Sequence, residues 1–508
     1  MTAPSAFPHC PALPPPLPML IAAAALLLGG CMSLAPSYEA PQAPVAERYA
    51  AEDLGSADGG VQAAALAWRS YFTEPRLQQL IAQALENSRD LRSATLRAAE
   101  AQAILGIQRA DLFPTVAATA DGARGRTPAD LSPTGRAVTA SQYQAGLGLA
   151  SWELDFWGRV RSLRDAALEN YLATDEARRA VSVSLVAQLA NAYFALRELD
   201  ERLALAQQTV ANRQEAVRIF TRRFEVGAIA RTDLVQTETL LHQAQSLAAQ
   251  LGQLRALQLH ALSLLVGMPL PELAQPGTLD DQAMAAELRA GLPSELLLQR
   301  PDILAAEHRL RAAHANIGAA RAAFFPRVTL TGAYGTASAE FSGLFDSGSS
   351  AWQFMPSLSL PIFDGGRNRA SLDLAQVRRN LAVSDYEKTI QSAFREVSDA
   401  LAARRWLGEQ LGADRATLAA QAERARLAQL RYDHGSAPYF EVLDAQRELL
   451  SAQQQLVQTR RALLASRVNL YAALGGGSAE FATQPALATL PSASASASAA
   501  AATAPSAP

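Results

Sequence analysis

The residues best suited to chemistry are few in this chain and are poorly placed for catalysis. Its 508 residues include six histidines and two cysteines, and no HExxH pattern or carboxylate spacing suited to a metal occurs among them. The one lysine, Lys388, lies between Glu387 and Thr389, so no Gly-Lys-Ser/Thr phosphate loop is present. Gly146-x-Gly148 lacks the third glycine of a dinucleotide loop. We expect no enzyme activity, no metal and no cofactor other than a covalent lipid.

Two carboxylates, Glu441 and Asp444, are the remaining candidates for a functional role. They lie three residues apart and share one helical face. One interpretation is that they are favourable charges near a helix N-terminus. The other is that several chains bring copies of them into one acidic ring. The formal net charge is −3 and no basic stripe is present, so no nucleic-acid partner is expected.

Cys31 is a candidate for lipid attachment. It follows an apolar run, Pro18–Gly30, that has the length of a secretory-signal core and is too short to cross a bilayer as a helix. Leu28-Gly29-Gly30-Cys31 resembles the lipobox of bacterial lipoproteins, which predicts a signal peptide over 1–30 and a lipid on Cys31. An ordinary signal peptide with an incidental cysteine stays open. Residues 1–17 contain no lysine or arginine, unlike a usual signal, so the true start codon also stays open.

The elements that position these residues occur twice. Residues 90–114 align without gaps on residues 302–326, with ten of 25 positions identical. A second alignment, shifted by 208 residues, pairs Gly227 with Gly435. We therefore predict a duplicated chain. Its expected parts are an N-terminal segment 31–67, a first repeat 68–270, a second repeat 271–475 and a disordered Ala/Ser/Pro-rich tail 476–508.

Each repeat contains two alternating stretches of roughly ten residues, the length that a tilted strand needs to cross a membrane. Aromatic residues gather at one end of them, as in an interfacial girdle. Two soluble hairpins packed on helices are the alternative. The predicted strands cover about 115–124, 141–153, 327–336 and 352–362.

Very long helices are predicted after the strands. No proline occurs in 159–224 or 367–432, so each can form one helix of roughly 100 Å. Shorter helices follow over about 232–265 and 439–474. The last one carries two adjacent seven-residue apolar stripes, which favour neighbours on both sides, as in a bundle or a cylinder.

Four strands cannot close a barrel, and an open sheet edge in lipid would leave backbone groups without partners. Several chains must therefore pool their strands. Strand counting alone does not choose between two chains and three.

Together these features resemble the TolC-like outer-membrane factor family, in its lipidated efflux branch, over about Cys31 to Gly477. The matching motifs are Trp68-x-x-Tyr71-Phe72, Trp152-Glu153-Leu154-Asp155-x-x-Gly158-Arg159, Arg300-Pro301-Asp302-Ile303, Gly318-x-Ala320-Arg321-Ala322-Ala323-Phe324-Phe325-Pro326, Arg431-Tyr432-x-x-Gly435 and Val442-Leu443-Asp444-Ala445-Gln446-Arg447.

The resemblance implies an α+β membrane protein. Three chains would each contribute four transmembrane strands to a 12-stranded β-barrel, which would continue into a periplasmic α-helical barrel with an equatorial region near 269–298. It implies periplasmic tips that contact the adaptor at Val226, Gly227, Ala228, His434, Gly435 and Ser436. Glu441 and Asp444 would form an acidic gate, with Asp233 and Tyr432 holding neighbouring helices shut. Ala437 stands where some members have an arginine in this lock.

The function implied is the outer-membrane exit channel of a tripartite efflux pump in a Gram-negative bacterium, passively conducting small molecules such as drugs. The implied partners are two further copies of the chain, outer-membrane lipid, a periplasmic adaptor (membrane fusion protein) and an inner-membrane transporter of the resistance-nodulation-division type. A type I protein-secretion duct and a periplasmic coiled-coil scaffold are the alternatives.

Overall fold

The computed structural model describes residues 33–49, 61–274, 276–284, 288 and 293–482. The expected signal peptide, Cys31 and residues 483–508 lie outside this part of the chain. The chain divides into two compact units. Of the described residues, unit 1 comprises 33–38, Leu105–Ala167 and Arg311–Arg379, and unit 2 comprises the others.

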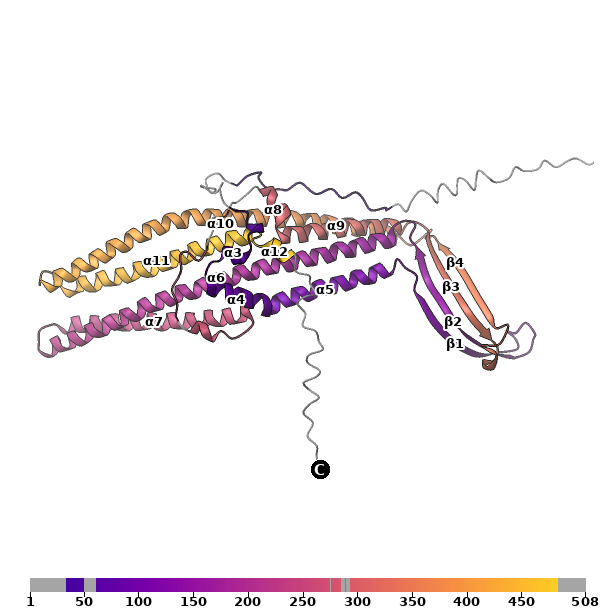
Figure 1. The fold of residues 1–508 in the computed structure, drawn as a ribbon, viewed down its shortest axis with the longest axis horizontal. Coiled ribbons are helices and arrows are strands. Elements are labelled where there is room, and N and C mark those ends of the chain that lie inside the picture. Colours follow the sequence, from indigo (N-terminus) through magenta and orange to yellow (C-terminus); the bar gives the residue numbers. More distant parts are fainter. Residues whose placement is uncertain (1–32, 50–60, 275, 285–287, 289–292, 483–508) are drawn as a thin grey trace, which may run out of the picture. The chain divides into compact units, whose positions relative to one another are not determined.

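The elements follow a duplicated order of short helix, two strands, long helix and shorter helix (Figure 1). The first set is η2 (Ala63–Ala65), α3 (Trp68–Tyr71), α4 (Pro75–Asn87), α5 (Arg89–Ala110), β1 (Val116–Thr127), β2 (Val138–Leu154), α6 (Arg159–Glu225) and α7 (Arg231–Val266). The second set is η3 (Pro271–Ala274), α8 (Pro293–Gln299), α9 (Pro301–Ala322), β3 (Arg327–Ser338), η4 (Phe341–Gly343), β4 (Ser350–Ser359), α10 (Arg367–Asp433), α11 (Tyr439–Ala473) and α12 (Ser478–Ala482).

The core of unit 1 is one antiparallel sheet with the strand order β1-β2-β3-β4 (Figure 1). β1 and β2 are longer than the sequence analysis predicts. Arg126 pairs with Thr139 and Thr127 with Val138, so residues beyond the predicted strand ends continue the ladder. β4 ends at Ser359 rather than near residue 362, because Pro361 has no N–H to donate to a partner strand.

The register of the sheet separates an apolar face from a polar one. Trp352 lies opposite Tyr334, and Tyr334 lies opposite Leu147, so side chains of these three residues share a face. Gln353 lies opposite Ala333 on the other face. The apolar face carries Val116, Ala118, Leu147, Leu149, Val328, Leu330, Tyr334, Trp352, Phe354 and Leu358, and the polar face carries Thr119, Asp121, Gln142, Gln144, Thr329, Thr331, Gln353 and Ser357.

A β-bulge in β2 keeps this separation intact. Leu149 pairs with Gly332 and Trp152 pairs with Leu330, so three steps along β2 match two along β3. The extra residue lets Ser151 adopt a φ of 28°. Trp152 therefore stays on the apolar face, although the alternation along β2 would otherwise place it on the polar one.

β2 and β3 approach most closely at a pair of glycines. Gly146 lies opposite Gly335 in the ladder. A Cβ on Gly335 would lie 2.2 Å from the carbonyl oxygen of Ala145, and one on Gly146 would lie 2.5 Å from that of Tyr334. Both positions therefore exclude any side chain. Gly146 thus has a packing role, consistent with the absence of a nucleotide loop.

Unit 2 contains two helical hairpins, α6–α7 and α10–α11 (Figure 1). Both turns are made in the same way. Gly227 and Gly435 have φ values of 72° and 70°, a conformation that glycine adopts without strain. The following amide of Ala228 donates to Arg223 O and that of Ser436 donates to Arg431 O, each at 2.8 Å, as in a Schellman motif.

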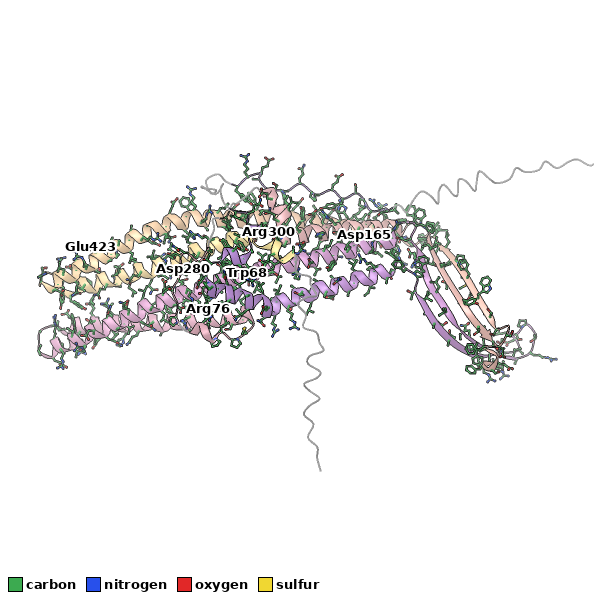
Figure 2. The ribbon with its side chains drawn as sticks, in the orientation of Figure 1. Trp68, Arg76, Asp165, Asp280, Arg300 and Glu423 are labelled. Carbon is green, nitrogen blue, oxygen red and sulfur yellow. The ribbon has the colours of Figure 1, made fainter. Side chains whose placement is uncertain are left out.

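Aromatic packing holds the middle of unit 2 together. The rings of Tyr71 and Tyr471 stack with centroids 4.4 Å apart. Trp68, labelled in Figure 2, is buried one helical turn before Tyr71. The Tyr471 hydroxyl donates to Leu66 O at 2.8 Å. The expectation of a disordered tail from 476 is wrong for its first residues. Helix α12 forms there because Phe481 is buried to 3% exposure.

A buried carboxylate ties the connecting segment after η3 to the helices. Asp200 accepts hydrogen bonds from Arg197 at 2.8 Å, from Arg255 at 2.5 Å and from the Gly277 amide at 3.0 Å. Its side chain is 0% exposed. The charges of two guanidinium groups offset the cost of burying the carboxylate.

No helix in the described part of the chain is both long enough and apolar enough to cross a membrane.

Candidate functional site

The six predicted tip residues lie in the two hairpin turns of unit 2. All six are exposed, and Val226 is 78% exposed. In the second turn, Ser436 Oγ donates to Arg431 O at 2.9 Å. The turns present exposed side chains on rigid backbone hydrogen bonds, which suits a docking surface for another protein.

The two acidic gate candidates are paired with arginines of the same hairpin. Arg431 donates to Glu441 at 2.7 Å. Asp444 accepts from Arg424 at 2.6 Å and from Arg447 at 2.7 Å. The sequence analysis considered the carboxylates alone. The structure places them in a network of both signs, because successive turns of α10 and α11 bring basic and acidic side chains together across the hairpin.

Tyr432 joins the two hairpins. Arg223 of α6 donates to its hydroxyl. The Tyr432 ring lies 4.8 Å from that of Tyr439, which in turn lies 4.4 Å from Phe220 of α6. Burial raises the pKa of the Tyr439 hydroxyl, so this hydroxyl stays protonated. The cluster connects α6 with both helices of the second hairpin.

Asp233 is exposed in the first turn of α7. No contact between Asp233 and Tyr432 is found among the described residues of this single chain. The 208-residue repeat explains the difference between the hairpins. Arg223 and Asp233 are the repeat equivalents of Arg431 and Glu441, which form an ion pair. In the first hairpin, Arg223 binds Tyr432 instead.

Arg213 is a buried cation between α6 and α11. It is 4% exposed, and its Nη2 donates to Leu443 O at a long 3.5 Å. Its Nη1 has no hydrogen-bond partner, and burial lowers the pKa of its guanidinium. The cost of desolvating the guanidinium lowers the stability of the contact between the two hairpins.

Sequence reasoning missed the arginines of this region, Arg213, Arg223, Arg424 and Arg431. The repeat carried a usable signal for two of them, since Arg223 and Arg431 occupy equivalent positions four residues before the turn glycines. Arg213 and Arg424 have no such signal, because their partners are set by helix packing.

Comparisons with known proteins cover most of the chain. The family description "Outer membrane efflux protein" matches residues 80–268 and 292–476, one match for each repeat. An antibiotic efflux pump outer membrane protein, ArpC of Pseudomonas putida, is 46% identical over 462 residues, which cover 90% of this chain and 95% of the relative. Outer membrane protein OprJ of Pseudomonas aeruginosa is 46% identical over 459 residues, which cover 89% and 94%.

Solved structures match as well. The open-state MtrE outer membrane channel of Neisseria gonorrhoeae aligns with a TM-score of 0.80 and 40% identity, over 88% of this chain and 98% of that one. A membrane protein from Pseudomonas aeruginosa aligns with a TM-score of 0.81 and 43% identity, over 87% and 100%. These matches confirm the predicted fold class of a duplicated chain with four antiparallel strands and long helices.

Proposed function

Because this chain belongs to the outer membrane efflux protein family, we propose that three copies of it form the exit channel of a tripartite drug-efflux pump. Family membership makes the chain an outer-membrane efflux channel of a Gram-negative bacterium and a pump component rather than an enzyme. The trimer, the further partners, the substrates and the gate residues are the proposal.

The observation that carries the proposal is the two-faced sheet with open edges. Its apolar face suits lipid, and its polar face suits a water-filled channel. The outer edges of β1 and β4 have no strand partner in the described part of one chain. In lipid these backbone groups require a partner, which a neighbouring chain supplies. Three chains give 12 strands and a closed barrel, whereas the alternative of a coiled-coil scaffold leaves the apolar face unexplained.

The substrates proposed are small amphiphilic molecules. One relative is called an antibiotic efflux protein and another a toluene efflux protein, and these names describe those proteins. Transport energy would come from an inner-membrane transporter of the resistance-nodulation-division type through a periplasmic adaptor. The test is drug susceptibility in a strain that lacks its own outer-membrane channel but keeps the adaptor and the transporter. Restored resistance supports the proposal. A correctly assembled chain that restores none contradicts it.

The tips at Gly227 and Gly435 would contact the adaptor, and Glu441 and Asp444 would set cation preference at the entrance. Exposure of the tips and the position of both carboxylates beside the second turn support this assignment. Replacing both carboxylates with alanine should lower cation selectivity in planar-bilayer recordings and leave the trimer intact. Unchanged selectivity would make them charges that only stabilise the hairpin. Asp233, left free of Arg223, would reach a neighbouring chain.

Cys31 would anchor the mature chain through a covalent lipid. The described part of the segment that follows it supports this position, because Ser33 is exposed and the next residues pack on α9. In unit 1, Arg321 donates to Leu34 O at 3.2 Å, and Arg311 lies 5.0 Å above the Tyr38 ring. Mass spectrometry of the mature N-terminus tests this.

We also propose that the two structural repeats extend over residues 68–270 and 271–475.

A further inference from the structure

A recess of about 740 Å³ lies within unit 2, between α6, α10 and α11. Arg300, which is labelled in Figure 2, directly precedes α9 and lines the recess. Pockets of roughly 300–1,000 Å³ are of the size that holds drug-like molecules. The recess is separate from the hairpin turns and from the acidic pair described above.

Small side chains create the recess. The facing sides of the three helices carry Ser184 and Ala187 on α6, Ala400 and Ala403 on α10, and Ala462 and Ala465 on α11. Leu407 adds apolar surface. Three packed helices with leucine at these positions would close the space, so the alanines leave an open apolar wall.

The recess opens on the face of the helices that other segments leave bare. Tyr49 stacks on Phe394 of α10 with ring centroids 5.0 Å apart, and Tyr471 of α11 bonds to Leu66. Phe394 and Tyr471 lie on helix faces opposite the recess, about 200° from Glu396 and Asn469, respectively. In the trimeric channel, on which this inference rests, the covered face is the outer wall. The recess therefore faces the interior.

The charge available in the recess is negative, because both arginines that line it are paired. Arg300 lies 2.5 Å from Asp302 and 2.8 Å from Glu396. Arg461 lies 3.2 Å from Glu198. Asp399 also lines the recess, with its side chain 72% exposed. Its nearest basic partner, Arg395, is 3.9 Å away. A loosely paired carboxylate beside an apolar wall favours a ligand with an apolar body and a positive charge.

We propose that this recess binds amphiphilic organic cations on their way through the channel. The alanine wall receives the apolar body, and the Asp399 carboxylate attracts the cationic group. Anionic and neutral solutes of equal size gain only the contact with the alanine wall. The recess is thus a selective binding site partway along a passive channel.

Protection of an introduced cysteine tests the proposal on the full-length purified protein. The described residues contain no cysteine, so Ser184→Cys gives a single reporter in the recess, with almost no change in volume. Ser451→Cys is the matched control. Ser451 is exposed on α11, about five turns from Asn469 on the same helical face, and it does not line the recess. The readout is the rate of maleimide labelling with and without rhodamine 6G, a lipophilic cation.

The expected result is slower labelling of Ser184→Cys by about tenfold at a dye concentration ten times its Kd, since only the free fraction reacts. Labelling of Ser451→Cys should not change. Adding Asp399→Asn should weaken dye binding about threefold, the size of one partly exposed ion pair, and should leave binding of neutral Nile red unchanged. Equal rates with and without dye at Ser184→Cys, or equal slowing at both cysteines, would overturn the proposal. Drug resistance conferred by the unlabelled variants is measured separately, so failure of the channel function itself is distinguishable.

Discussion

Replacing Phe354 with arginine tests whether the apolar face of the sheet contacts lipid. Phe354 is 61% exposed in the single chain and lies near the middle of β4. Arginine on the lipid face costs roughly 2–4 kcal/mol at the bilayer midplane and roughly 0–1 kcal/mol near the interfaces. In a trimer the penalty occurs three times. We expect Phe354→Arg to abolish most of the assembled channel.

A second position on β4, Leu358, tests how the cost of arginine depends on depth in the membrane. Leu358 lies four residues from Phe354 on the same face. At roughly 3.4 Å per residue and a tilt near 45°, this is about 10 Å of depth. Half of the apolar band is about 12 Å, so Leu358 lies close to an interface. Leu358→Arg should cost about 1 kcal/mol per chain and lower the trimer yield less than Phe354→Arg does.

The neighbouring residues supply matched controls. Gln353 and Ser357 precede Phe354 and Leu358 and lie on the polar face. Gln353→Arg and Ser357→Arg should assemble normally. The assay is the yield of heat-modifiable trimer in outer-membrane fractions on SDS gels. Equal yields for Phe354→Arg and Gln353→Arg would refute the assignment of the faces.

Three further substitutions address packing inside the chain. Asp200→Asn should cost about 3–5 kcal/mol in chemical unfolding, because it removes the buried carboxylate charge that Arg197 and Arg255 share, whereas Glu215→Gln in an exposed pair should change little. Gly335→Val should block sheet assembly on SDS gels, and Gly332→Ala, whose Cβ would be 3.5 Å from its nearest neighbour, should not. Burial raises the pKa of the Glu74 carboxyl above 4.5. The protonated carboxyl therefore makes its full contribution to the free energy of unfolding below pH 4.5, and this contribution is lost as pH rises through the folded-state pKa. Glu74→Gln should therefore make the melting temperature fall less between pH 5 and pH 8 than in the unchanged chain, and parallel curves would contradict this.

Sequence patterns predict the helices of this protein well because proline and glycine mark their ends. Phe113-Pro114 and Gly227 terminate helices by backbone geometry alone. Strand ends are harder to predict. Arg126 belongs to β1 although it lies on the same face as Val116 and Ala118, since a strand that leaves the lipid no longer has to alternate. Helix α12 was missed because one buried phenylalanine, and not a periodic pattern, holds it in place.

The candidate site was predictable in its positions and not in its partners. The repeat places Glu441 beside the second turn, and the sequence identifies both tips. Which guanidinium group each carboxylate meets depends on the rotation of one helix against another. This is why the duplicated arginines have different partners: Arg223 of α6 binds Tyr432 of α10, and Arg431 of α10 binds Glu441 of α11. Periodicity within a single helix carries no information about that choice.

The bulge in β2 sets how many residues this end of the strand can lose. Glu153, beyond the bulge, faces away from the apolar side and lies 2.7 Å from both Arg159 and Arg327. If Ser151 were lost, Leu149, Ala150 and Trp152 would follow one another in regular pairing, and Trp152 would still lie opposite Leu330. Only the loss of a second residue would move Trp152 to the polar face and Glu153 to the apolar one. This strand end therefore tolerates the loss of one residue but not of two.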